Sequence, residues 1–372
     1  MRIGIDARFY GSVGKGLGRY TQKLIENLER IDNRNSYFIF LRKENWNEYR
    51  PRNKNFNKVL ADVPWYSLKE QIFMPRILKK YQLDLVHFPH FNIPLFYKGK
   101  FVITIHDLIL FHFPTKRAST LSRFFYFVKL LGYRLVIRKA VKKSRAIITV
   151  SKYTKEDIIE NFKIDPDKII ITYEAVDILT QGAADSRERI LGKYGIIKPY
   201  LLYVGNAYPH KNLERLLLAF KEVLKKHSHL YLVMVGGEDY FYARLKKFVR
   251  ENKIDGVIFA GYVAEEHLPT VYREAVLYVF PSLYEGFGLP PLEAMARNIP
   301  VASSSSSCLP EVLGDAVYYF DPEGISEIAG AIEEVAVNNE LRRKLIQAGQ
   351  ARVRRYSWRK LAEKTLKVYE SH

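Results

Sequence analysis

The chain has 372 residues, with 59 lysine and arginine residues against 40 aspartate and glutamate residues, so its formal net charge is +19 at pH 7. This length exceeds that of one ordinary hydrophobic core and predicts two globular domains. A balance this basic favours an anionic partner, which could be nucleic acid, an acidic lipid surface or a phosphorylated substrate. The single cysteine, Cys308, excludes an intramolecular disulfide and fits a reducing cytosol.

The start of the chain reads as a strand, and no apolar run reaches about 18 residues. We therefore expect neither a signal peptide nor a transmembrane helix. In the first half, strands are predicted at 2–7, 36–41, 85–88, 101–106 and 146–150, and a helix at 19–30. In the second half, strands are predicted at 200–205, 230–236, 257–260, 275–280 and 299–302, and a helix at 213–226. Strands that alternate with helices pair in parallel and are covered on both faces.

Small and polar residues interrupt this pattern at 179–198, where we place a domain boundary. The sequence thus predicts an α/β protein with two Rossmann-like domains, residues 1–180 and 181–355, that face each other across a cleft. The last segment, 356–372, contains an amphipathic helix that is expected to cross back to the first domain. Ligands of such sheets bind at the carboxyl ends of the strands.

Four glycines, Gly11, Gly14, Gly16 and Gly18, follow the first predicted strand. They do not form G-x-G-x-x-G, because Arg19 stands in place of the third glycine, and no Gly-Lys-Ser/Thr of a Walker A motif occurs there. We favour a mobile stretch of bare backbone that can approach a diphosphate or an acceptor. The alternative is an ordinary turn between a strand and a helix.

Two polar segments follow predicted strands. A neutral imidazole at His106 could exchange a hydrogen bond close to the reacting atoms, although a lone histidine is more often structural. Lys211 precedes the predicted helix at 213–226 and suits a phosphate contact, while Asn212 could serve as a helix cap. The serine run at 303–307 is either a flexible loop or a segment that faces a ligand.

The most informative stretch is 282–295, Ser-Leu-Tyr-Glu-Gly-Phe-Gly-Leu-Pro-Pro-Leu-Glu-Ala-Met. Pro290 and Pro291 suit the first turn of a helix, which puts Glu285 in a loop and Glu293 in the opening helical turn. Bare amides before a helix form a ready anion site. An anion held beside two carboxylates indicates a ligand with a phosphate at one end and hydroxyls at the other, as in a nucleotide sugar.

We expect no metal site. No histidine or cysteine cluster has zinc spacing, and the only D-x-D sequence, Asp165-Pro166-Asp167, is better explained as a turn. Positively charged side chains would then neutralise the leaving diphosphate.

Residues 108–155 contain twelve lysine and arginine residues and no acidic residue, with aromatic side chains interleaved at 124–127. This composition is typical of a segment that docks on an anionic membrane or an acidic ligand. The alternative is that its apolar face packs within the domain and its cations are solvated. Nucleic acid ranks lower as a partner, because no RNA- or DNA-binding motif accompanies the charge.

Six segments carry a resemblance to a known family, and they spread over nearly the whole chain. They are Gly16-Leu17-Gly18-Arg19-Tyr20, Ile105-His106-Asp107, Tyr203-Val204-Gly205-Asn206, Pro209-His210-Lys211-Asn212, Pro281-Ser282-Leu283-Tyr284-Glu285-Gly286-Phe287-Gly288 through Glu293, and Leu309-Pro310-Glu311-Val312. In these segments the chain resembles the retaining nucleotide-sugar glycosyltransferases of family 4, which have the GT-B fold.

The resemblance implies an acceptor-binding first domain and a donor-binding second domain. Glu285 and His106 would contact the donor sugar and Lys211 the diphosphate, as the catalytic residues, and Glu293 would bind the ribose. The other residues implied to bind substrate are Gly16, Gly18, Asn206, Gly286, Phe287, Gly288 and Leu289. Many relatives carry arginine where this chain has Asn206, so one diphosphate cation is missing or replaced.

The segment 204–212 resembles bacterial mannosyltransferases more than glucosyltransferases. The resemblance implies a cytoplasmic enzyme, able to associate with the inner face of the plasma membrane, that needs no cofactor. It would move a hexose, with mannose favoured, from GDP-mannose or another nucleotide-diphosphate sugar to a hydroxyl of a glycan or lipid-linked acceptor in cell-surface polysaccharide synthesis. The alternatives are a sugar phosphorylase or sucrose-type enzyme of the same fold, and a non-catalytic carbohydrate- or nucleic-acid-binding protein.

Overall fold

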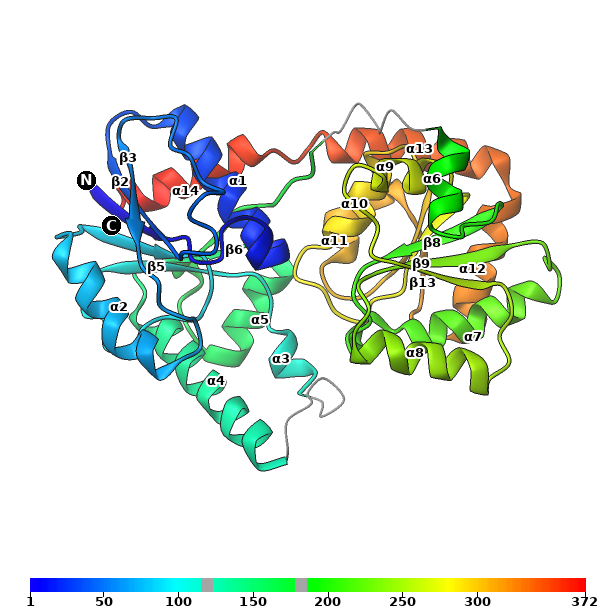
Figure 1. Ribbon diagram of the computed structural model, residues 1–372, viewed down its shortest axis with the longest axis horizontal. Coiled ribbons are helices and arrows are strands. Elements are labelled where there is room, and N and C mark those ends of the chain that lie inside the picture. The colour runs from blue at the N-terminus through cyan, green and yellow to red at the C-terminus, as the bar shows by residue number, and fades with distance from the viewer. Residues whose placement is uncertain (115–122, 178–185) are drawn as a thin grey trace. The chain divides into compact units, whose positions relative to one another are not determined.

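The computed structural model describes residues 1–114, 123–177 and 186–372, which form two compact units (Figure 1). The first unit contains residues 1–108, 123–174 and 357–372, and the second contains 109–114, 175–177 and 186–356. The chain therefore leaves the first unit at Glu174 and returns to it at Ser357. The sequence placed the boundary at 180 and did not anticipate that residues 109–114 belong to the second unit.

The first unit is built on a seven-stranded, fully parallel sheet in the order β3-β2-β1-β4-β5-β6-β7. Helices α1 and α14 lie on one face of this sheet, and α2, α4 and α5 lie on the other (Figure 1). The elements are β1 (Arg2–Asp6), η1 (Gly11–Gly14), α1 (Lys15–Ile31), β2 (Ser36–Leu41), β3 (Phe56–Leu60), α2 (Leu68–Lys80), β4 (Leu85–Phe88), β5 (Phe101–Ile105), α4 (Arg123–Lys143), β6 (Ile147–Thr149), α5 (Lys152–Phe162), η3 (Pro166–Lys168), β7 (Ile169–Ile171) and α14 (Trp358–Glu370).

The second unit has a six-stranded parallel sheet in the order β10-β9-β8-β11-β12-β13. Helix α7 packs against α8 and α12, whereas α10 packs against α13. The elements are α3 (Ile109–His112), α6 (Arg187–Lys193), β8 (Tyr200–Val204), η4 (Pro209–Lys211), α7 (Leu213–Leu224), β9 (Tyr231–Val235), α8 (Tyr240–Glu251), β10 (Val257–Gly261), α9 (Leu268–Arg273), β11 (Leu277–Phe280), α10 (Leu289–Met295), β12 (Val301–Ser304), α11 (Leu309–Leu313), η5 (Gly314–Ala316), β13 (Tyr318–Phe320), α12 (Ile325–Val337) and α13 (Asn339–Val353).

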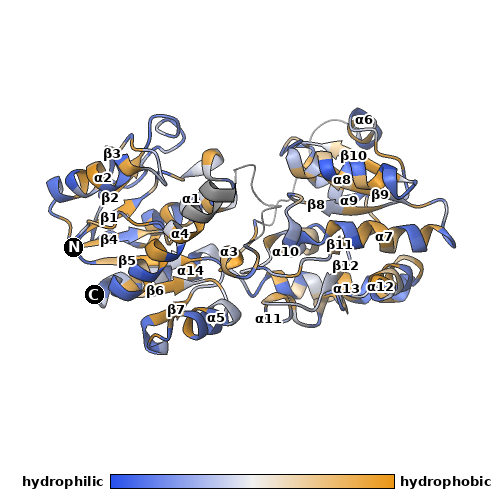
Figure 2. Cartoon of the chain, turned by 90° about the horizontal axis from the view of Figure 1, so that it is seen from below, coloured by the Kyte–Doolittle hydropathy of each residue, from blue (hydrophilic) through white to orange (hydrophobic). Residues whose placement is uncertain are grey.

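Burial explains why these segments take these forms. Central strands such as β5 are apolar apart from one threonine and are fully buried, as expected for a parallel sheet covered on both faces. Helix α1 buries Tyr20, Leu24 and Leu28, which recur every four residues and so share one face. Figure 2 shows the same division, with hydrophobic strands in the interior and mixed helices around them. The predicted α/β architecture of two Rossmann-like domains is confirmed.

The glycine cluster is helical rather than a stretch of bare backbone. Gly11 to Gly14 form η1, and Gly16 and Gly18 lie in the first turn of α1. A Cβ at Gly18 would lie 2.1 Å from the carbonyl oxygen of Gly11 and 2.4 Å from that of Phe9, so close packing alone requires glycine there. A Cβ at Gly16 would meet no atom within 4 Å, which leaves its backbone open to a ligand.

Helix α14 packs on α1 and is tied to the sheet by a buried polar chain. The hydroxyl of Tyr369 lies 2.6 Å from Nδ1 of His87, whose Nε2 lies 2.8 Å from Oγ1 of Thr104. Thr104 Oγ1 in turn lies 3.2 Å from the hydroxyl of Tyr20 on α1. Burial, assisted by the charge of His106, lowers the pKa of His87 to about 3. A neutral imidazole has one donor and one acceptor, which suits two hydroxyl partners.

Replacing Tyr369 with phenylalanine should destabilise the first unit by about 1–3 kcal/mol, because it leaves a buried ring nitrogen of His87 without its partner. All three tryptophans, Trp46, Trp65 and Trp358, lie in the first unit, so the fluorescence of urea-unfolded samples reports on this unit. Tyr81→Phe is the matched control, since the Tyr81 hydroxyl makes no hydrogen bond to the described part of the chain. Equal urea midpoints of unfolding for Tyr369→Phe and Tyr81→Phe would contradict a stabilising role of the buried polar chain.

Candidate active site

Two loops of the second unit bring a lysine and a glutamate together. Strands β8 and β11 are parallel neighbours, so the loops that follow them meet at the carboxyl edge of the sheet. Lys211 Nζ lies 2.5 Å from Glu285 Oε1, and the two side chains are 12% and 10% exposed. The ammonium also lies 5.5 Å from the centre of the Phe280 ring. Solvent screens a pair this buried far less than a surface pair.

The backbone around the pair is held by its own hydrogen bonds. The Asn212 amide donates to the carbonyl oxygens of Pro281 (3.1 Å) and Pro322 (2.7 Å), and the Leu283 N–H donates to the carbonyl of His210 (2.8 Å). Asn212 occupies the N-cap position of α7, as the sequence suggested, but its side chain joins neighbouring loops instead of donating or accepting a capping hydrogen bond. Burial and the charge of Lys211 lower the pKa of His210 to about 4, so this histidine is neutral and Lys211 supplies the cation.

Residues 286–288 connect Glu285 to α10 through a tight, buried turn. Gly288 has φ +90°, and a Cβ there would lie 2.8 Å from Leu309 Cδ2, so glycine is required. Pro290 and Pro291 occupy the first turn of α10, as predicted, and this helix starts at Leu289. Glu293 is its fifth residue and lies in the second turn, not in the opening turn that the sequence suggested.

Asn206 cannot supply the cation that the family resemblance led us to expect at this position. Its side-chain oxygen accepts a hydrogen bond from the Tyr208 N–H at 3.3 Å, and its carbonyl accepts one from the Tyr203 hydroxyl at 2.7 Å. The residue therefore shapes its own loop.

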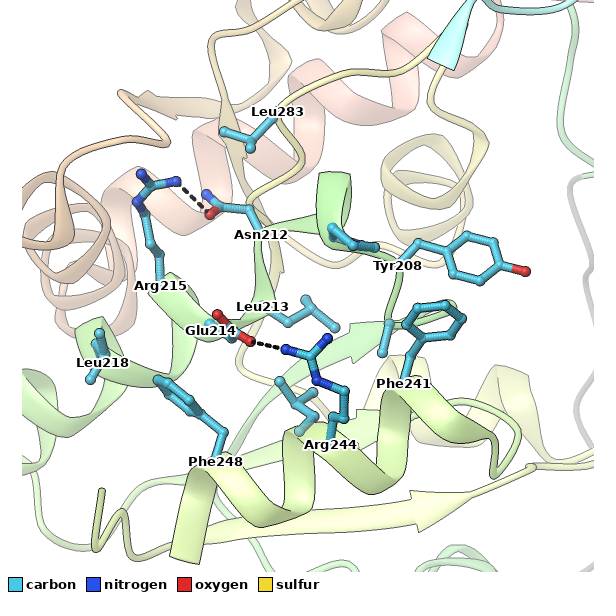
Figure 3. Close-up of a pocket in the computed structure, with 13 residues that line it drawn as sticks. Tyr208, Asn212, Leu213, Glu214, Arg215, Leu218, Phe241, Arg244, Phe248 and Leu283 are labelled. Carbon is cyan, nitrogen blue, oxygen red and sulfur yellow. Dashed lines mark hydrogen bonds and ion pairs between the residues drawn. The ribbon is translucent and has the colours of Figure 1, made fainter. Parts of the chain in front are cut away.

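A pocket of about 400 Å³ lies under this loop, between α7 and α8 (Figure 3). Its walls are largely apolar, with Phe241 and Phe248 from α8, and its charged side chains are Glu214, Arg215 and Arg244. Arg244 pairs with Glu214 at 3.7 Å, and Arg215 donates to Asn212 at 3.0 Å (Figure 3). Neither Lys211 nor Glu285 lines the pocket, so it borders the loop that carries Lys211 without containing the ion pair.

In the first unit, His106 follows β5 and both of its ring nitrogens face acceptors. Nδ1 lies 3.1 Å from Glu174 Oε1, and Nε2 lies 3.0 Å from the carbonyl oxygen of Pro89. Burial lowers the pKa of His106, but the hydrogen bond and charge of Glu174, the Pro89 carbonyl and the charge of Asp107 outweigh burial, so the pKa is raised. These contacts favour the imidazolium form of His106, whereas the sequence analysis considered a neutral imidazole.

A buried charge cluster that no sequence pattern indicated lies after β1. Arg8 is fully buried, with Nη2 at 2.7 Å from Asp6 Oδ2 and 2.5 Å from Glu70 Oε1. Asn92 donates to both oxygens of Glu70 at 2.9 Å. Burial lowers the pKa of Arg8, but the two carboxylates outweigh it and raise that pKa. The cluster holds the start of α2 against the carboxyl edge of the sheet.

Two other neighbours of the candidate residues were also missed. Ser307, at the end of the serine run, accepts a hydrogen bond from the Glu285 N–H at 3.0 Å. The run therefore ends beside a candidate site residue, and a ligand-facing role for the run stays a prediction. Glu174 follows β7, a strand of three isoleucines that was too short to stand out. Recognising β7 would have put Glu174 at the same sheet edge as His106.

Among the described residues, no group of three or more histidine, cysteine, aspartate or glutamate side chains could hold a metal ion. Metal independence stays a prediction. Asp165 accepts a hydrogen bond from the Asp167 N–H at 2.9 Å at the start of η3, so the D-x-D sequence forms the predicted turn. No described helix has both the length and the apolarity needed to cross a membrane. The aromatic side chains at 124–127 lie outside the part of the structure that is described.

Two Rossmann-like domains in tandem, each built on a parallel sheet, have the architecture of the GT-B fold. The chain is similar in fold to sucrose-phosphate synthase from Thermosynechococcus elongatus, with a TM-score of 0.78 over 100% of this chain and 98% of that chain at 20% identity.

Sequence comparisons give the family. Residues 14–179 match the model "Glycosyltransferase Family 4", and residues 186–352 match the model "Glycosyl transferases group 1". The chain belongs to glycosyltransferase family 4. It is 28% identical to O-antigen chain mannosyltransferase B of Escherichia coli over 95% of this chain and 96% of that protein. It is also 28% identical to O-antigen chain mannosyltransferase RfbU of Salmonella typhimurium over 74% of this chain and 71% of that protein.

Replacing Glu174 with glutamine should lower the pKa of His106, because the carboxylate charge that raises this pKa is removed. NMR titration of the His106 ring measures the pKa. The pKa of His106 is raised in the folded protein from its ordinary 6.5. The pair therefore stabilises the protein fully below pH 6.5, and this stabilisation is lost as the pH rises through the folded pKa. Glu174→Gln should cost more stability at mildly acidic than at alkaline pH. Glu160→Gln, at an exposed position on α5, is the control variant. A loss of stability in Glu174→Gln that does not change with pH would contradict the ion pair between His106 and Glu174.

Proposed function

We propose that this protein is a retaining, metal-independent mannosyltransferase. It moves mannose from GDP-mannose, or a hexose from another nucleotide-diphosphate sugar, to a hydroxyl of a glycan or lipid-linked acceptor in cell-surface polysaccharide synthesis. The observation that carries the proposal is the contact between Lys211 and Glu285, because it joins a cation suited to a diphosphate with a carboxylate suited to sugar hydroxyls. The choice of mannose is supported by the mannosyltransferases to which the chain is similar.

Lys211 would change partners when the donor binds. In the structure its ammonium compensates the charge of Glu285 at 2.5 Å. A diphosphate carries more negative charge than one carboxylate and would attract the ammonium more strongly. As Lys211 turns to the diphosphate, the oxygens of Glu285 become available to accept hydrogen bonds from the sugar. The backbone N–H groups of Gly286, Phe287 and Gly288 would add donors to the diphosphate or the sugar, next to Leu289, and Glu293 would bind the ribose.

The chemical step needs no enzyme nucleophile in this proposal. The bond between C1 of the sugar and the diphosphate oxygen breaks, and its electron pair stays on the oxygen. The acceptor hydroxyl forms its bond to C1 on the same face, and its proton passes to the departing phosphate oxygen. The configuration at C1 is thereby retained. Lys211 stabilises the charge that grows on the diphosphate, and His106, whose pKa is raised, would contact the donor sugar.

The proposed setting is the cytoplasm at the inner face of the plasma membrane, where a lipid-linked acceptor would be reached. The net charge of +19 supports contact with an anionic surface.

Two substitutions test the roles in the ion pair. Lys211→Ala should reduce turnover by about 10²–10³, the usual effect of losing one preorganised group that stabilises transition-state charge. Glu285→Gln should also reduce turnover, but affinity for the free nucleotide diphosphate should stay the same or increase, because Lys211 is released. Donor-dependent nucleotide release and calorimetry measure the two quantities.

Lys225→Ala is the control for these variants, because Lys225 is 65% exposed and pairs only with Glu222 among the described residues. Turnover like that of the wild type in Lys211→Ala would reject Lys211 as the diphosphate cation. Loss of nucleotide binding in Glu285→Gln would move Glu285 from the sugar to the nucleotide.

The donor is identified by calorimetry with GDP, UDP, ADP and their sugar conjugates in the presence of a chelator. We expect GDP and GDP-mannose to bind most tightly, without metal, and free nucleotide to be released from the sugar conjugate. A preference for another nucleotide would reassign the donor. Binding that appears only when Mg²⁺ or Mn²⁺ is restored would overturn metal independence, and absence of any binding by folded protein would reject the transferase proposal.

A further inference from the structure

Helix α2 exposes a stripe of apolar side chains. Leu68 is 85% exposed, Ile72 49% and Phe73 46%. Leu68 and Ile72 are one helical turn apart and share a face, and Phe73 follows Ile72 at about 100° around the helix, so it borders that face. Met74 and Leu78 of the same helix are buried against the sheet. The exposed stripe is therefore additional to the side that forms the core, and no packing requirement of the fold accounts for it.

The apolar stripe continues through Phe96 to α4. Phe96 is 67% exposed, and on α4 Leu131 and Leu135 are 50% and 56% exposed and one turn apart. The backbone N–H of Leu95, next to Phe96, donates to the Gln71 side chain of α2 at 2.6 Å. On the other side, Lys139 Nζ of α4 lies 5.8 Å from the centre of the Phe96 ring. Both helices cover the same face of the sheet (Figure 1).

These contacts make one continuous surface within the first unit, here called the α2–α4 surface. Its apolar members are Leu68, Ile72, Phe73, Phe96, Leu131 and Leu135. Soluble proteins rarely leave so many large apolar side chains together in water, and patches of this kind mark interaction sites.

The exposed charged side chains of α2 and α4 are all positive. The exposed cations are Lys69, Arg76, Lys79, Lys80, Arg134, Arg138, Lys142 and Lys143. The only carboxylate of α2, Glu70, is fully buried and bonded to Arg8 and Asn92. Helix α4 contains no acidic residue. Apolar side chains set among exposed cations match the boundary between headgroups and acyl chains in an anionic bilayer.

We propose that the α2–α4 surface docks the protein on an anionic lipid bilayer. The apolar side chains enter the headgroup boundary, and the lysine and arginine side chains bind lipid phosphates. The biological sense of this docking rests on the proposed transfer to a lipid-linked acceptor. The surface itself is independent of that transfer, because it includes neither the ion pair of Lys211 and Glu285 nor any donor contact.

The experiment is co-sedimentation of the full chain with vesicles, without donor or acceptor. Vesicles of phosphatidylcholine are compared with vesicles of phosphatidylcholine and phosphatidylglycerol. We expect binding to the anionic vesicles, little binding to the neutral ones, and release at high salt, which screens the cations. The double variant L68S/F96S should bind about tenfold more weakly or worse, because two large apolar side chains no longer leave water.

The control is I197S/V337S, which removes two exposed apolar side chains (50% and 58%) from the second unit and should bind like the wild type. A charge variant, K69Q/R76Q, should weaken binding and reduce its dependence on salt. Calorimetry with nucleotide on L68S/F96S shows whether the donor site is intact. The docking proposal and the transferase proposal can therefore fail separately.

Three outcomes would overturn the docking proposal. The first is absence of binding to anionic vesicles, or equal binding to both kinds. The second is vesicle binding by L68S/F96S that matches the wild type. The third is a dimer in analytical ultracentrifugation that L68S/F96S abolishes, together with absence of vesicle binding, which would assign the surface to a second copy of the chain.

Discussion

Parallel strand pairing is the constraint on which the candidate site depends. Every strand pair in both sheets is parallel. Each strand must therefore end on the same edge as its neighbours, and the loops that follow adjacent strands meet there. In the second unit this brings Lys211, Glu285 and Ser307 together from three loops far apart in the sequence. In the first unit it brings His106 to Glu174.

Charges gathered at such an edge are partly removed from water, and the protein compensates each of them. Lys211 is paired with Glu285, His106 with Glu174, and Arg8 with two carboxylates. A buried charge without a partner would cost several kcal/mol. The Lys211–Glu285 pair differs from the Arg8 cluster, because the side chains of Lys211 and Glu285 keep some exposure whereas that of Arg8 keeps none. Arg8 is therefore a fixed structural cation, and Lys211 is a cation that an incoming anion can reach.

Helix α2 connects two features of the first unit. Its Glu70 is held in the Arg8 cluster at the carboxyl edge of the sheet, and its N-terminal cap is Ser67, whose hydroxyl accepts from the Glu70 N–H at 3.1 Å. One turn of the same helix presents Leu68 and Ile72 to solvent. A bilayer that binds the exposed stripe would thus act on a helix whose first turn is anchored at the edge where ligands of parallel sheets bind. The docking surface and the ligand edge share a rigid element.

The sequence by itself determined the α/β class, most of the strands, and the segments with Lys211, Glu285 and the two prolines of α10. Long apolar runs, turn glycines and prolines act locally, so a local pattern reports them. The three-residue strands β7 and β13 carry too little pattern to be found, and β3 mixes apolar with polar residues.

Only the tertiary structure decided what each charged side chain touches. His106 and Glu174 are 68 positions apart, and Lys211 and Glu285 are 74 apart. Sheet order, not local sequence, sets such distances. The tertiary structure also turned the first glycines into a closely packed helix start, and it left the apolar stripe of α2 in solvent rather than in the core. Periodicity predicts that a helix has an apolar face, but only packing decides which apolar side chains find a partner.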